Sequence, residues 1–156
     1  MEANVGGGVE KGVEKGRERR SGSALGLEVR LLGPLTIRRQ GQELALPASR
    51  KARALIGYLS LASQAIPRSQ LCELLWDVPN DPRGELRWCL SKLRGILDAP
   101  QCPRLESRGD SIRLDLANCF VDAVEISRAT QTGIGSLSPA RLRELCALFN
   151  GNCSTA

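Results

Sequence analysis

The spacing of apolar residues changes near Pro47, from a strand period to a helix period, and that change limits the possible folds more than any other feature. Upstream of it, Leu27, Val29 and Leu31 alternate with charged residues, which is the two-residue period of a strand with one buried face. Downstream of Ser49, apolar residues recur about every 3.6 positions, as they do in amphipathic helices. A run of strands followed by a run of helices predicts an α+β fold rather than repeated βαβ units.

The first part of the chain predicts an antiparallel sheet. Three short strands are expected, over residues 27–31, 35–38 and 43–46. Gln40-Gly41 is the expected turn between the second and third strands, because glycine adopts positive φ without strain. Residues 1–26 are rich in glycine and charge and hold little to bury, so they predict a disordered leader.

The second part predicts three helices and a hairpin. The first helix follows Ser49 as its N-cap, and the second opens at Pro67 after a very short strand. The third helix covers residues 82–97, with Asp81 as N-cap and Pro82 in its first turn. Its buried stripe consists of Leu86, Leu90, Leu93 and Leu97, with Cys89 beside them. A hairpin is then expected, with strands 104–107 and 111–114 around the turn Arg108-Gly109-Asp110.

The absence of histidine from the 156 residues excludes whole classes of site. Neither a Ser-His-Asp triad nor a Cys-His pair can form, and no metal site can use a histidine ligand. The six cysteines include no C-x-x-C spacing, so a zinc ribbon is not indicated. No pocket motif places carboxylates, lysines or cysteines for catalysis. We therefore expect no enzymatic activity, no catalytic residue, no metal and no cofactor.

Targeting signals are also missing from the sequence. The N-terminal block has no apolar core of a secretory signal, and no apolar stretch is long enough to cross a membrane. We expect a cytoplasmic protein without a membrane partner, whose reduced thiols mostly pack in the core. Cys89, on the flank of the third helix, is the thiol that could couple oxidation to binding.

The exposed face of the third helix is basic, in a chain whose formal net charge is +5. Residues expected to point away from the leucine stripe are Arg83, Arg87, Trp88, Ser91, Lys92, Arg94 and Gly95. A helix of this kind fits the DNA major groove, where Arg and Lys pair with guanine edges or phosphates. The shorter helix before it completes a helix-turn-helix, and Arg108 in the hairpin could contact the backbone or the minor groove. The alternative is an ordinary solvated face, with Trp88 partly buried. For Trp76 we favour a place in the core.

Residues 27–115 resemble the OmpR/PhoB-type winged helix-turn-helix, in the version that opens antibiotic regulatory proteins of the SARP family. The matching segments are Leu27–Leu35 (LEVRLLGPL), Arg53–Leu59 (RALIGYL), Arg68–Trp76 (RSQLCELLW) and Leu90–Arg94 (LSKLR). The resemblance departs from the family at Pro67, where a Ser or Thr cap is usual, and at Ser91, where a cation is common in the PhoB branch. The hairpin also ends differently, in Asp110-Ser111-Ile112.

The resemblance implies a sequence-specific transcriptional regulator that binds repeated promoter elements in double-stranded DNA and recruits RNA polymerase as an activator. A second copy of the chain on the DNA is a further expected partner. By position, the groove-facing residues are Arg87, Trp88, Ser91 and Lys92, the backbone contacts are Arg83 and Arg94, and the wing contact is Arg108. The loop Asp77–Asp81 matches the segment that touches polymerase in this fold.

Residues 116–156 resemble the start of a helical bacterial transcriptional activation domain, which is incomplete here. One helix pair is expected, and it should either lack packing partners or fold back on the winged helix. The apolar residues concerned are Leu142, Leu145, Leu148 and Phe149. The exposed helix pair and the altered hairpin motivate an alternative function, a winged-helix protein-interaction module that no longer binds DNA.

Overall fold

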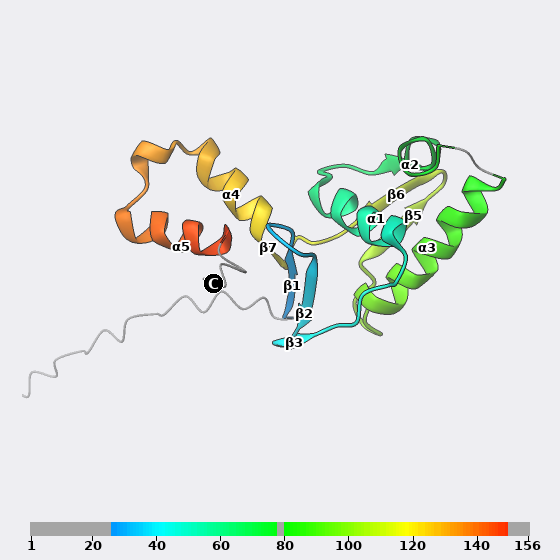
Figure 1. Cartoon of the computed structure of the whole chain (residues 1–156), viewed down its shortest axis with the longest axis horizontal. Coiled ribbons are helices and arrows are strands. Elements are labelled where there is room, and N and C mark those ends of the chain that lie inside the picture. Colours follow the sequence, from blue (N-terminus) through cyan, green and yellow to red (C-terminus); the bar gives the residue numbers. More distant parts are fainter. Residues whose placement is uncertain (1–25, 78–79, 150–156) are drawn as a thin grey trace, which may run out of the picture.

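A computed structural model of the chain describes residues 26–77 and 80–149. The expected leader therefore lies outside the described residues except for Gly26. In Figure 1 the helices and hairpin of residues 50–114 lie on one side of the molecule, the helices of residues 122–149 lie on the other, and a small sheet lies between them. The fold is a mixture of helices and two sheets, in the order that the sequence predicts except for one short strand near residue 120.

The small sheet begins with an antiparallel meander of β1 (Leu27–Arg30), β2 (Thr36–Arg39) and β3 (Gln42–Glu43). Both residues of the turn before β3 have positive φ, 51° at Gln40 and 81° at Gly41. Such a turn matches the twist of the two strands that it joins, so the predicted hairpin is confirmed.

The prediction of a strand over 43–46 is wrong in its extent. The ladder ends at Glu43, after which the Leu44 N–H still donates to the Ile37 carbonyl at 2.8 Å. Leu44 and Leu46 instead pack, half-buried, against the core that the helices share. Beyond this one bond to β2, the alternation of Leu44 and Leu46 reflects packing on the core on the way to the first helix.

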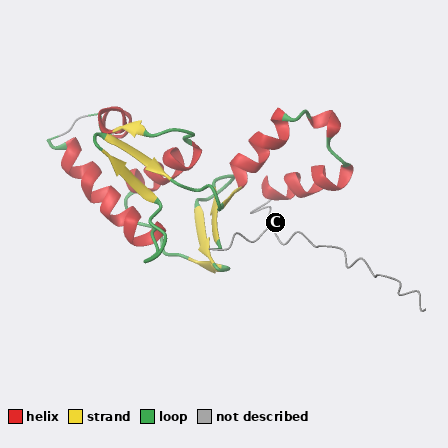
Figure 2. Ribbon diagram, turned by 180° about the vertical axis from the view of Figure 1, so that it is seen from behind, coloured by secondary structure: helices red, strands yellow, loops and turns green. Residues whose placement is uncertain are grey.

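A fourth strand, β7 (Phe120–Val121), lies parallel to β1 and completes the order β3-β2-β1-β7. This strand is not among those predicted from the apolar pattern. Two residues are too few for a periodic pattern, and the partner strand is about 90 positions away. Through β7 the last part of the chain joins the sheet made by the first part, as Figure 2 shows from behind.

Three helices follow the meander, α1 (Arg50–Leu61), α2 (Arg68–Leu75) and α3 (Pro82–Leu97). The Ser49 hydroxyl accepts from the Ala52 N–H at 3.3 Å, and the Asp81 carboxylate accepts from the Gly84 N–H at 2.8 Å. Pro67 precedes α2 without a side-chain cap. The three helix starts predicted from these residues are confirmed.

The core of this half is aliphatic and lies where the helices meet the sheets. The predicted stripe of α3 is buried, together with Leu55, Ile56 and Leu59 of α1. Trp76 is 6% exposed, which confirms its place in the core. Burial of this seam leaves the opposite face of α3 to the solvent.

A second sheet has the order β4-β6-β5, from β4 (Ile66–Pro67), β5 (Leu105–Arg108) and β6 (Ser111–Leu114). The expected hairpin is present, but its turn is shorter than predicted. Arg108 pairs with Ser111 as the last residue of β5, so the turn contains Gly109 and Asp110 alone. Gly109 has a φ of 56°, which permits so tight a connection.

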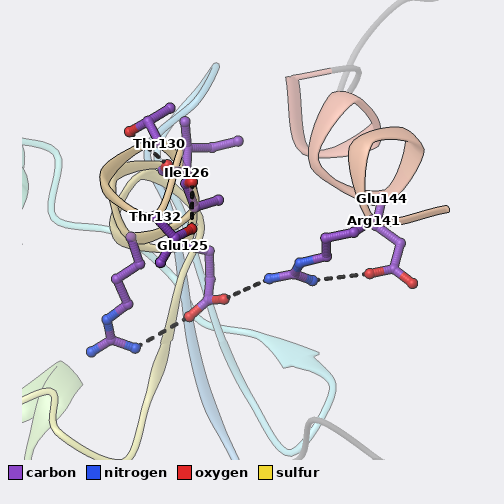
Figure 3. Close-up of polar contacts among 8 residues, drawn as sticks. Glu125, Ile126, Thr130, Thr132, Arg141 and Glu144 are labelled. Carbon is purple, nitrogen blue, oxygen red and sulfur yellow. Dashed lines mark hydrogen bonds and ion pairs between the residues drawn. The ribbon is translucent and has the colours of Figure 1, made fainter. Parts of the chain in front are cut away.

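The last helices are α4 (Asp122–Gln131) and α5 (Pro139–Phe149), joined by a short 3₁₀ helix, η1 (Ile134–Ser136). Leu145 is buried between them, whereas Phe149 is 58% exposed. A charge network crosses the pair: Arg141 of α5 donates to Glu125 at 3.1 Å and to Glu144 at 2.9 Å (Figure 3). Helix α4 thus contacts α5 on one side and also the strands β1 and β7 of the small sheet.

One buried carboxylate attaches this helix pair to the sheet. Asp122, the first residue of α4, is fully buried. It accepts the backbone N–H of Leu31 at 2.8 Å, of Leu32 at 3.0 Å and of Ala123 at 2.7 Å. Three such donors satisfy a charge that would otherwise be costly to bury. Leu31 was predicted to continue the first strand, but its backbone N–H donates to the Asp122 carboxylate and the strand ends at Arg30.

Candidate nucleic-acid interface

The polar face of α3 is where the predicted site residues lie. All six that the sequence places on this helix are exposed, namely Arg83, Arg87, Trp88, Ser91, Lys92 and Arg94. The leucines on the opposite side are buried, so the rotation of the helix about its axis is fixed by its core. A rigid rod with an exposed cationic face results.

Both ends of α3 are held by side chains. At its C-terminal end, the Arg39 guanidinium donates to the carbonyl oxygens of Ile96 and Leu97, each at 2.9 Å. These carbonyls have no partner within the helix, and a cation there also favours the helix dipole. Beyond the helix, the Asp98 carboxylate accepts from the Arg104 N–H at 2.8 Å. Arg39 thus ties β2 to the end of α3, which sequence reasoning did not predict.

A cavity of about 600 Å³ lies between α3 and the hairpin. Its lining residues are Arg68, Arg83, Leu86, Arg87, Leu90, Arg94 and Asp110. Four of these are arginines and one is acidic. A concave surface with such an excess of one charge concentrates the field and attracts anions.

The hydroxyl of Ser107 is the point at which two of these arginines converge. It accepts from Nη2 of Arg94 at 2.7 Å and, by a longer contact, from Nη2 of Arg68 at 3.5 Å. The backbone N–H of Arg68 also donates to the Asp110 carbonyl at 2.8 Å. Sequence reasoning missed Arg68 and Ser107 as site residues. The one available signal was that Arg68 lies in an acid-free stretch, 44–72.

Asp110 provides the acidic contact inside the cavity. Its carboxylate lies 3.9 Å from Nη1 of Arg83, and both side chains are more than half exposed. A pair this long and this exposed contributes little to stability. It does, however, offset part of the positive charge in the cavity.

Trp88 and Lys92 form a pair on the outer face of α3. The Trp88 side chain is 49% exposed, so neither full burial nor full exposure describes it. The Lys92 Nζ lies 5.5 Å from the centroid of its ring, which is cation–π distance. The Trp88 ring thus lies beside the ammonium group of Lys92, which follows it by one helical turn.

Arg108 does not belong to the α3 cavity. Its side chain is 82% exposed and lies 3.4 Å from the Glu106 carboxylate. Ile112, opposite Ser107 in the hairpin, is buried, and side chains alternate along a strand. Ser107 therefore faces α3, while Arg108 projects from the other face of the hairpin. Arg83, Arg87 and Arg94 thus line the cavity together, Trp88 and Lys92 pair on the outer face of α3, and Arg108 lies apart from both groups.

Cys89 is unsuited to rapid oxidation. It is buried in the leucine seam, and burial raises the pKa of its thiol above the ordinary value of 9.0, with Glu85 adding to the shift. The thiolate is the reactive form, so such a thiol reacts slowly near neutral pH. Among the described residues, no group of three or more Cys, Asp or Glu is placed to hold a metal ion. No helix in this part of the chain is both long and apolar enough to cross a bilayer.

Comparison with known proteins finds a likeness of fold to a solved structure. No known family and no curated protein matches the sequence. The fold is similar to that of Mycobacterium tuberculosis EmbR, solved in complex with a low affinity phosphopeptide, with a TM-score of 0.52 and 26% identity. The match covers 60% of this chain and 26% of the EmbR chain, so this chain spans about a quarter of that protein. The likeness supports a SARP-like winged-helix fold.

Proposed function

We propose that the chain is a sequence-specific DNA-binding transcriptional regulator that inserts α3 into the major groove. The observation that carries this proposal is the exposed cationic face of α3, opposite a buried leucine seam. An α-helix fits the width of the major groove, and the anchored ends of α3 reduce the entropy that is lost on binding. The likeness to EmbR and the resemblance to SARP regulators support the same class of function.

The residues divide into two roles under this proposal. Arg87, Trp88, Ser91 and Lys92 face the base edges, and Arg83 and Arg94 neutralise phosphates on either side. Arg108, on the other face of the hairpin, contacts the backbone or the minor groove beside the site. Residues 27–115 form the DNA-binding unit, and 116–156 begin the activation domain.

Activation through RNA polymerase is the further part of the proposal. The loop 77–81 joins α2 to α3, and its residues 78–79 lie outside the described residues. Binding to promoter repeats as two copies, in the cytoplasm, follows from the SARP resemblance. A transcription assay with purified polymerase on the bound promoter distinguishes an activator from a repressor.

The test begins by selecting duplexes from a random pool with the purified chain. The double variant Lys92→Ala/Arg94→Ala should bind the selected duplex at least about tenfold more weakly, because two cations leave the interface. A matched control is Arg128→Ala/Arg143→Ala, which removes two exposed arginines of α4 and α5. Equal gel-shift affinity of the wild type and the Lys92/Arg94 variant would refute the role of α3.

A protein-interaction module is the second candidate. The observation that favours it is the exposure of Ile134 and Phe149 on the helix pair, since large exposed apolar side chains often mark contacts with other proteins. On this alternative the chain would flow through heparin at moderate salt and co-purify with a protein. Retention on heparin together with selection of a duplex favours the DNA-binding proposal.

A further inference from the structure

We propose that Arg68, Arg94 and Ser107 form a binding site for one phosphate group of the DNA backbone. This inference rests on the proposed function and adds two residues to it, one from α2 and one from β5. Arg94 was assigned a backbone contact by resemblance, whereas Arg68 and Ser107 had no assigned role.

Two positively charged side chains meet at the hydroxyl of Ser107. Two guanidinium groups donate to one neutral hydroxyl, at 2.7 and 3.5 Å. None of the ion pairs within residues 26–77 and 80–149 includes Arg68 or Arg94. The positive charge at this point is therefore not neutralised by a carboxylate. A phosphate oxygen could accept from both arginines, and the Ser107 hydroxyl retains its proton to donate to it.

The backbone segments that carry Arg68, Arg94 and Ser107 are held together in the absence of a ligand. The Arg68 N–H donates to the Asp110 carbonyl at 2.8 Å, which fixes the start of α2 to the turn of the hairpin. Pro67 pairs with Ser111 in the same sheet, so α2 and the hairpin cannot separate without breaking the ladder. Sites whose donors are already positioned lose less entropy on binding, and the planar guanidinium matches the geometry of phosphate.

The position of the site favours a backbone phosphate over a free one. Arg83 and Arg87 line the same cavity as Arg68 and Arg94, and they follow one another along α3. A single free phosphate would engage only the end of this row. A nucleic-acid strand beside the helix offers successive phosphates, so Arg83 can contact a second phosphate while Arg87 faces the base edges.

The main experiment measures the salt dependence of duplex binding by Arg68→Ala. One lost phosphate contact should lower the slope of log affinity against log salt by about 0.9. That corresponds to about eightfold weaker binding near 0.1 M salt and to no difference near 1 M. The backbone N–H of residue 68 remains, so the fold should persist, and Trp76 fluorescence checks this. Arg68→Lys, which keeps the charge without the fork, should restore part of the loss.

The control and the second variant make the result specific. Arg143→Ala removes an exposed arginine of α5 and should leave the slope unchanged. Ser107→Asp places a carboxylate between the two arginines and should weaken binding more than Arg68→Ala does, since it also repels the phosphate. Parallel slopes for wild type and Arg68→Ala, or tighter binding by Ser107→Asp, would overturn the proposal.

A methylphosphonate scan locates the phosphate. Neutral linkages are introduced one at a time into the selected duplex. At one linkage, neutralisation should weaken binding by the wild type but should not further weaken binding by Arg68→Ala, which no longer contacts that phosphate. The same loss in both proteins at every position would overturn the site.

Displacement of the duplex by millimolar inorganic phosphate, but not by sulfate at equal ionic strength, would instead identify a free phosphate as the ligand. If the wild type binds no duplex, the proposed function fails as well. If it binds duplex with the Arg68→Ala slope unchanged, this site alone fails.

Discussion

Replacement of Asp122 by alanine should release the α4–α5 pair from the rest of the protein. The change deletes the acceptor for the Leu31 and Leu32 N–H groups, which are 91 and 90 positions away in the sequence. Hydrogen bonds to a charged group contribute about 1.5–3 kcal/mol each. Because Leu31 and Leu32 are half-exposed, water can replace part of the loss, and we take the lower limit for both bonds. The expected cost is about 3 kcal/mol, or over a hundredfold in the docking equilibrium.

The two tryptophans make this prediction measurable, because both lie in the α1–α3 half, at positions 76 and 88. In urea, tryptophan fluorescence reports unfolding of that half, while far-UV circular dichroism reports all helices. The Asp122→Ala variant should show an early loss of helical signal ahead of the fluorescence transition. Glu144→Ala, which removes one exposed partner of Arg141, should cost under about 1 kcal/mol and serves as a control. Coincident transitions at the wild-type midpoint for Asp122→Ala would refute the reasoning.

Three further predictions follow from single contacts. Asp110→Asn removes the carboxylate from the arginine cavity and should tighten duplex binding about 2–5-fold at low salt; unchanged affinity in a titration would show that the charge is screened. Arg39→Met should destabilise the fold by about 1–3 kcal/mol and speed hydrogen exchange in the last turn of α3, unless water replaces the guanidinium. Burial raises the pKa of the Cys89 thiol above 9.0, so near and above pH 9 the folded state binds more protons than the unfolded state. The free energy of unfolding should therefore fall as pH rises. Urea titrations between pH 8 and 10 should show a smaller fall for Cys89→Ala than for the wild type.

The helices could be predicted from the sequence because their signals are local. Asp81 and Pro82 mark the start of α3, and four leucines at helical spacing define its buried face. The strand over 43–46 was predicted too long because alternation cannot distinguish a paired strand from an extended segment that packs on a core. The short parallel strand β7 has no periodic signal, and nothing near Asp122 indicates that its partners are the Leu31 and Leu32 N–H groups.

In the candidate site, too, the features with a local sequence signal could be predicted and those that depend on distant residues could not. The exposed residues of α3 could be predicted from the helical period alone. Arg68 and Ser107 could not, since they are 39 positions apart and meet only when the hairpin folds against α2. Arg108 was expected in the turn of the hairpin, where alternation does not apply, and only the two-residue turn makes it the last residue of β5 and so assigns it to the outer face.

The small N-terminal sheet connects the two halves of the molecule by separate strands, and this allows docking and DNA binding to be tested independently. Asp122 and β7 attach the helix pair to β1 and to the residues that follow it. Arg39, by contrast, holds the end of α3 from β2. Asp122→Ala should therefore leave duplex affinity within about threefold of wild type, whereas Arg39→Met should weaken it, because the binding helix loses an anchor. Loss of duplex binding in Asp122→Ala, with the fluorescence transition unchanged, would mean that the helix pair itself contributes to the DNA interface.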